Sequence, residues 1–167
     1  MKWTHAFCFA IIFGMLPLGW ADDPLPPKGK PVTVKISLSK EDRARLLRAA
    51  RGTEATFLVG LTGNVIVPRE VFPLGIRVFL NKPEATAATS IDDPSYVMSS
   101  AFGHKQITAS KFASYRFSDV ENLAIGLRRL QINQEAESLT LTVVVIGLGA
   151  DKSRLLLHEA TILPEAK

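Results

Sequence analysis

Apolar and polar residues alternate with a period of two along much of this chain, a pattern typical of strands with one buried face. The pattern is clearest over residues 31–39, where valine, isoleucine and leucine alternate with threonine, lysine and serine. Thr62, Gly63 and Asn64 supply turn chemistry. Other segments with alternating, β-branched or aromatic residues predict further strands: 53–61, 71–80, 96–102, 112–117, 139–146 and 155–163. Residues 65–67 could start another short strand, which Pro68 would end.

Two segments have helical signals instead. Ser39 precedes two acidic residues and is suited to cap a helix that Gly52 can end. Ser118 and Glu121 have the spacing of a capping box, in which each side chain bonds the backbone N–H of the other residue. The second helix would then bury apolar residues at helical spacing: Val120, Leu123, Ala124, Leu127 and Leu130.

The order of these elements predicts the fold class. Six or seven strands are separated mostly by turns and are not regularly interleaved with helices. This arrangement favours a mainly β fold, an antiparallel β-sandwich or barrel with one or two short helices, over a parallel α/β sheet. We expect one such domain over residues 31–167.

The first predicted helix is rich in arginine. These side chains could form an anion-binding face, but a solvated helix face is the commoner reason for such a pattern. We therefore expect the arginines to be exposed: Arg43, Arg45, Arg48 and Arg51.

The N-terminal segment is predicted to be a cleavable signal peptide, residues 1–21. Lys2 provides the positive charge, residues 6–18 are apolar but short for a bilayer span, and small residues precede the expected cleavage after Ala21. Residues 22–30 form a proline-rich leader, which we expect to be extended. The mature protein would be secreted or periplasmic, with no membrane span.

Composition excludes several classes of function. The chain has one cysteine, Cys8, and it lies in the expected signal, so the mature protein would have neither disulfides nor thiolate metal sites. The formal net charge is +4, without a dense basic run or an aromatic stacking platform. We therefore expect no nucleic-acid partner.

The chain has few groups for catalysis. After residue 21 the only histidines are His104 and His158, and no nucleophile elbow, phosphate loop or zinc-binding helix motif is present. Asp92 and Asp93 precede a proline and fit a turn better than a calcium loop. We expect no catalytic residues and no cofactor, and only His104 and Met98 remain as candidate soft metal ligands.

Several segments together resemble a known family. Residues 76–81 (IRVFLN), 91–97 (IDDPSYV), 99–104 (SSAFGH) and 115–120 (YRFSDV) resemble, in this order, the C-terminal domain of tyrosinases, polyphenol oxidases and molluscan haemocyanins. The strand predicted over 139–146 fits as well. Met98 departs from a common glycine, and Ala101 precedes Phe102 where two aromatic residues are frequent.

The resemblance implies a small antiparallel sandwich that packs over a dicopper domain and supplies no copper ligands itself. This chain has no histidine-rich helical bundle. We therefore expect a non-catalytic accessory or binding module that docks on a separately encoded tyrosinase-like dicopper oxidase. Two alternatives stay open: a copper-handling protein of the export pathway that uses His104 and Met98, and a structural or adhesion sandwich.

Overall fold

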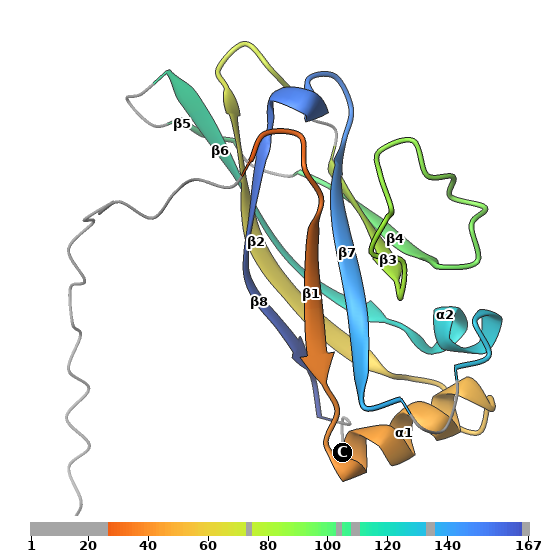
Figure 1. Ribbon diagram of the computed structural model, residues 1–167. Helices are drawn as coiled ribbons and strands as arrows, with labels where there is room; N and C mark the ends of the chain where they lie inside the picture. Colours follow the sequence, from red (N-terminus) through yellow and green to blue (C-terminus); the bar gives the residue numbers. More distant parts are fainter. Residues whose placement is uncertain (1–26, 73–74, 103–104, 108–110, 133–135, 165–167) are drawn as a thin grey trace, which may run out of the picture.

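Two four-stranded antiparallel sheets pack face to face in the computed structural model (Figure 1), which describes residues 27–72, 75–102, 105–107, 111–132 and 136–164. In strand order, the first sheet contains β1 (Val32–Ser37), β7 (Ser138–Ile146), β3 (Gly75–Leu80) and β4 (Tyr96–Ala101). The second sheet contains β5 (Lys105–Ile107), β6 (Phe112–Asn122), β2 (Leu58–Pro68) and β8 (Arg154–Ile162). Helices α1 (Lys40–Ala50) and α2 (Ala124–Arg129) lie side by side at one end, and the short helix η1 (Ala150–Lys152) lies at the other.

The predicted fold class is confirmed: the chain is a mainly β sandwich of antiparallel sheets with short helices. The described residues contain eight strands rather than six or seven. The additional strand is β5, which pairs with β6. Residues 103–104 lie outside the described part of the chain.

The turn predicted at Thr62–Asn64 is wrong, because these residues lie in the middle of β2. They pair with β6 in an unbroken register in which Gly63 faces Phe117. The glycine that suggested a turn is used instead for close packing, since a Cβ at position 63 would lie 2.5 Å from Cζ of Phe117. A glycine inside a strand commonly marks such a close approach.

The capping box predicted at Ser118 and Glu121 is also wrong. Both residues lie in β6, where Ser118 pairs with Thr62 and Glu121 with Val59. The α2 helix begins later, and its first turn is joined to the side chain of Asn122, whose Oδ1 accepts from Ala124 N at 3.0 Å. The ladder between two eleven-residue strands outweighs the local capping preference.

The start of α1 agrees with its prediction. Ser39 is the N-cap, and its Oγ accepts from Asp42 N at 3.0 Å while Ser39 N donates to Asp42 Oδ2 at 3.3 Å. This is a complete capping box. Gly52 follows the helix with φ +78°, as expected for a residue that ends a helix.

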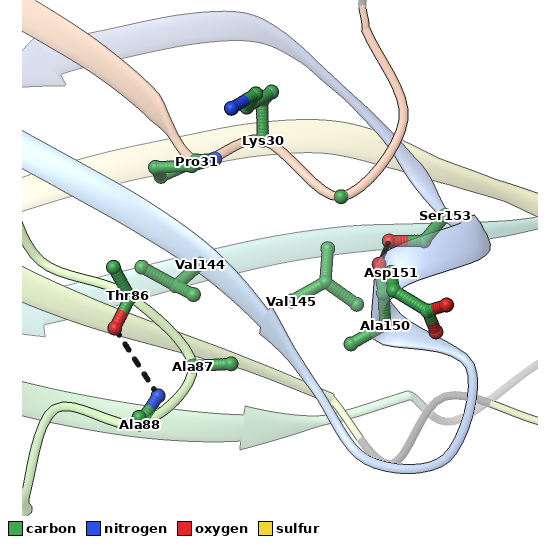
Figure 2. Close-up of a pocket in the computed structure, with 11 residues that line it drawn as sticks. Lys30, Pro31, Thr86, Ala87, Ala88, Val144, Val145, Ala150, Asp151 and Ser153 are labelled. Carbon is green, nitrogen blue, oxygen red and sulfur yellow. Dashed lines mark hydrogen bonds between the residues drawn. The ribbon is translucent and has the colours of Figure 1, made fainter.

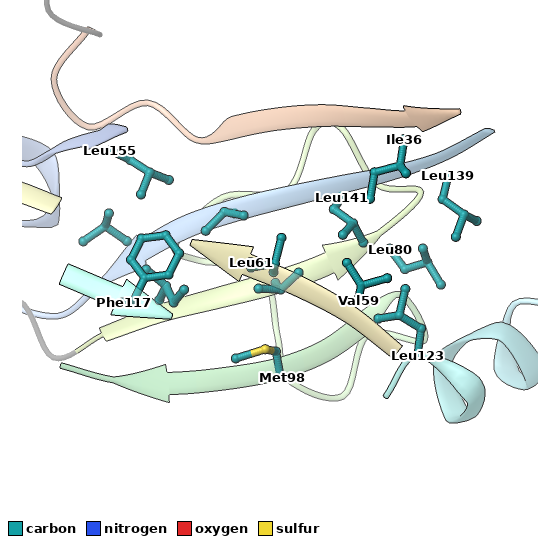
Figure 3. Packing of buried hydrophobic residues seen from close by; sticks show 14 of the residues in the cluster. Ile36, Val59, Leu61, Leu80, Met98, Phe117, Leu123, Leu139, Leu141 and Leu155 are labelled. Atoms are coloured by element: carbon teal, nitrogen blue, oxygen red, sulfur yellow. The ribbon is translucent and has the colours of Figure 1, made fainter. Parts of the chain in front are cut away.

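The main core lies between the two sheets (Figure 3). Inward-facing residues of both sheets are almost fully buried, and α1 and α2 close one end with Leu46, Ala49 and Leu127. A second, small cluster lies on the outer face of the first sheet, where residues 82–95 cover Phe79 and Val144. We call these residues the covering loop.

The described start of the chain is attached to the sandwich. Gly29 N donates to Ser153 O at 2.8 Å, so the last residues of the predicted leader contact the loop before β8. The predicted signal peptide, its cleavage after Ala21 and most of the leader lie outside the described residues. Within the described part of the chain, no helix is long and apolar enough to cross a membrane.

Candidate functional site

Of the two candidate metal ligands, Met98 lies among the described residues. Met98 lies on β4 opposite Val78, is 7% exposed and belongs to the main core. His104 lies outside the described residues, so that part of the prediction is not tested. No group of three or more histidine, cysteine, aspartate or glutamate residues that could hold a metal is found among the residues described.

His158 lies at an irregularity of the edge strand β8. Thr62 pairs with Glu159 and Gly63 with Leu157, so His158 is the extra residue of a β-bulge, and its side chain is exposed. A bulge twists an edge strand and protects it from pairing with another chain. An edge role for this histidine agrees with its position, whereas a core role does not.

Asp93 stabilises the covering loop. Its Oδ1 accepts from Ser95 N at 2.9 Å and from the Ser95 hydroxyl, and its Oδ2 lies 3.1 Å from Lys82 Nζ. The Ser95 hydrogen bonds, followed by the contact with Lys82, hold the pKa of Asp93 below its usual value. The same pairing raises the pKa of Lys82. The Asp93 carboxylate therefore has a structural role, since it holds the turn of the covering loop through Ser95 and Lys82.

Arg45 corrects the expectation of a uniformly solvated arginine face. It is 6% exposed, its Nη1 donates to Leu163 O at 3.1 Å, and its guanidinium carbon lies 5.6 Å from the centre of the Phe57 ring. Glu54, also buried, lies 3.7 Å from Arg45 Nε and 2.9 Å from Arg48 Nε. Arg48 and Arg51 are exposed, as expected, whereas Arg43 is half-buried.

This cluster has a structural role. Arg45 joins α1 to the chain after β8, and Glu54 neutralises it in a place with little water. The sequence contains a signal for this burial, since Arg45 precedes the buried Ala49 by four residues and shares its side of the helix.

Two carboxylates lie near each other on the inner side of β6. Asp119 and Glu121 follow the alternation that buries Tyr115 and Phe117, and both are half-buried. Burial raises the pKa of Glu121 above its usual value, and the charge of Asp119 adds to this effect. Among the described residues, no third histidine, cysteine, aspartate or glutamate joins this pair in a group that could hold a metal ion.

A cavity of about 370 Å³ opens between three segments that are distant in the sequence (Figure 2). Its walls are the start of the described chain, the covering loop and the end of the sandwich that includes η1. The hydroxyls in the wall are engaged locally, since Thr86 accepts from Ala88 N and Ser153 donates to Ala150 O. The lining residues are mainly small or apolar: Gly29, Lys30, Pro31, Thr86, Ala87, Ala88, Val144, Val145, Ala150, Asp151 and Ser153.

Exposed apolar side chains gather at the same end of the sandwich. Leu148 is 86% exposed, Phe72 61% and Phe112 43%. Phe112 pairs with Pro68 at the end of β2, and residues 69–72 continue from there. Gly149 packs against Val71, because a Cβ at position 149 would lie 2.3 Å from its Cγ1. We call residues 69–72, 111–112 and 147–152 the loop end.

Comparison with known proteins shows a likeness of fold. The chain is similar to latent aurone synthase (polyphenol oxidase) from natural source, with a TM-score of 0.51 and 16% sequence identity. The aligned region covers 87% of this chain and 27% of that chain. The recombinantly expressed latent aurone synthase has a TM-score of 0.48 and 17% identity over the same shares of the two chains. No protein-family model and no curated protein matches the sequence.

This likeness extends the sequence resemblance to the fold. The chain spans about a quarter of the length of the polyphenol oxidase that it matches. A domain of that size and fold agrees with the C-terminal domain to which the motifs of residues 76–104 pointed. At this identity the similarity concerns the fold.

Sequence reasoning missed both the cavity and the loop end. Each is assembled from segments that only the folded sheets bring together, and none of the segments carries a motif. Leu148 had a partial signal, since it is a large apolar residue between two glycines, Gly147 and Gly149.

Proposed function

We propose that this protein is a non-catalytic, exported accessory module that docks on a separately encoded dicopper oxidase. The observation that carries the proposal is the similarity of fold to about a quarter of a latent polyphenol oxidase. In the family that the sequence motifs resemble, a domain of this kind lies over the dicopper domain. Here the docking would take place between two chains.

The chemistry of the described residues is consistent with this role. The buried charges Arg45 and Glu54 neutralise one another, and Asp93 is engaged by Ser95 and Lys82. Met98 packs in the core, and no observation favours a copper-handling function for it. The proposed contribution of the protein is therefore its folded surface.

The outer face of the second sheet is the surface that we propose for docking. The outer face of the first sheet is covered where the covering loop buries Phe79 and Val144. On β6, by contrast, Arg116, Ser118 and Val120 are exposed, which shows that no described segment covers them. A stable interface needs roughly 800 Å² from each partner.

The first test measures activity. The purified protein, loaded with copper, is expected to oxidise neither monophenols nor catechols. Turnover of either substrate by the single chain would overturn the proposal.

The second test measures docking. The tagged protein is expected to co-purify with a histidine-rich oxidase from the same cell envelope. Val120→Arg should abolish this co-purification, because it places a charge on the outer face of β6. Ile125→Arg on α2 is the matched control, since Ile125 is 55% and Val120 59% exposed. Equal effects of the two substitutions would refute docking through this face.

A further inference from the structure

The loop end has exposed apolar side chains on three segments of the chain. Leu148 follows β7, Phe72 follows β2 and Phe112 begins β6, so three connections each present one large apolar residue to solvent. Most large apolar residues of the described chain are buried. Among the few that are exposed, Leu148 has the largest exposed fraction. Such a group of exposed apolar residues at one end marks an interaction site more often than chance exposure does.

Basic side chains lie beside these exposed apolar residues. Arg69 and Lys111 are adjacent, because Arg69 N donates to Lys111 O at 3.1 Å. Lys152 lies in η1, and Gly29, which is bonded to Ser153, places further lysines beside it. Exposed basic residues outnumber exposed acidic ones here: Lys28, Lys30, Arg69, Lys111 and Lys152 against Glu70 and Asp151.

We propose that the loop end binds the surface of an anionic lipid bilayer. Leu148 and Phe72 would enter the boundary between headgroups and acyl chains, while the lysines and Arg69 contact lipid phosphates. Burial of apolar side chains together with attraction to anionic lipids is how peripheral proteins bind membrane surfaces. This inference is independent of docking on an oxidase, which we place on the second sheet.

The arrangement favours a bilayer over a protein partner. Leu148 is 86% exposed on the connection after β7, so a protein partner would need a pocket shaped for this side chain. A bilayer accepts protruding apolar side chains at any position, and its negative charge complements the basic rim. The exposure of Leu148 and the charge of the basic residues beside it therefore both favour an anionic bilayer as the partner.

The experiment measures binding of the purified protein to lipid vesicles by co-sedimentation. We expect binding to vesicles of phosphatidylcholine mixed with phosphatidylglycerol, weaker binding as salt is raised, and little binding to phosphatidylcholine alone. Leu148→Ser should weaken the partition by about tenfold, the loss expected for one buried leucine. Lys111→Gln with Lys152→Gln should weaken binding to the anionic vesicles only.

Matched controls separate insertion from general stickiness. Ile125→Ser removes an apolar residue that is 55% exposed at the opposite end, and it should leave vesicle binding unchanged. Leu148→Trp should give a blue-shifted emission on anionic vesicles, whereas Ile125→Trp should not, because both natural tryptophans, Trp3 and Trp20, precede the expected cleavage site. Thermal melting checks that each variant is folded.

Two results would overturn the proposal. The first is equal binding to anionic and neutral vesicles, or a partition that Leu148→Ser does not change. The second is failure to bind any vesicle. If Leu148→Ser then abolishes co-purification of an acidic protein, the loop end is assigned to a protein partner instead.

Discussion

The ring of Phe117 occupies the space that a side chain at position 63 would need, directly across the β2–β6 ladder. Gly63 is paired with Phe117, and a Cβ built there would lie 2.5 Å from Cζ of the ring and 2.4 Å from Leu156 O. The glycine thus lets the aromatic ring fill the core beside the bulge of β8.

Gly63→Ala is therefore expected to destabilise the protein by at least about 2 kcal/mol, because the added methyl group meets backbone as well as ring. Chemical denaturation measures this change. Gly126→Ala in α2 is the control: its Cβ would lie 3.6 Å from Leu80 Cδ2, an ordinary contact, so this variant should gain up to about 1 kcal/mol from helix propensity. A loss of stability in both variants would contradict this account of Gly63.

Asn122, rather than Ser118, should control the start of α2. Asn122 Oδ1 accepts from Phe57 N at 2.9 Å and from Ala124 N at 3.0 Å, and its Nδ2 donates to Ala55 O at 3.0 Å. Asn122→Ala is expected to cost about 2 kcal/mol, since it removes three hydrogen bonds. Ser118→Ala should change stability by less than about 0.5 kcal/mol. The opposite order of the two losses would restore the capping box predicted from the sequence.

Local signals predicted part of this fold well. The strands over 96–102, 139–146 and 155–163 and the Ser39 cap depend on alternation or on contacts within a few residues, and the structure contains each of them. The turn at 62–64 and the helix start at Ser118 failed for one shared reason. Both segments belong to the long ladder between β2 and β6, and pairing between residues so far apart in the chain is absent from any local window.

The candidate surfaces could not be predicted from the sequence for a similar reason. The cavity joins residues near position 30, the covering loop and the segment before β8, which meet only after both sheets form. Burial of Arg45 likewise depends on Phe57 and Leu163, which lie on other elements. Composition could still be used to limit the classes of function considered, because the numbers of cysteines and histidines and the net charge are counted without knowledge of the fold.

The buried pair formed by Arg45 and Glu54 leads to a further prediction. Glu54→Gln should destabilise the protein by about 2 kcal/mol, because it leaves the buried guanidinium of Arg45 with only the more exposed carboxylate of Asp42, whose Oδ1 lies 3.7 Å from Arg45 Nη1. Arg48→Gln should cost less than about 1 kcal/mol, since the Arg48 side chain is 49% exposed. Urea denaturation of both variants, with Glu41→Gln on the exposed side of α1 as control, measures the difference. Equal costs for Glu54→Gln and Arg48→Gln would show that Arg45 does not depend on Glu54.

The raised pKa of Glu121 predicts how stability changes with pH. Burial and the charge of Asp119 disfavour the ionised form in the folded state, so this residue's stabilising contribution is complete below its unfolded pKa and is lost as pH rises through the folded value. Glu121→Gln, which stays neutral, should therefore be more stable than the natural protein near pH 7 and equal to it at about pH 4 and below. Denaturation at both pH values measures this.

The Asp119→Asn background provides the control for Glu121, because it removes the neighbouring charge. There the advantage of Glu121→Gln near pH 7 should become smaller but should not vanish, since burial is the larger of the two causes. An advantage that disappears completely would make Asp119 the main cause. A Glu121→Gln variant that is less stable than the natural protein near pH 7 would mean that the ionised carboxylate has a favourable partner, contrary to the environment described for β6.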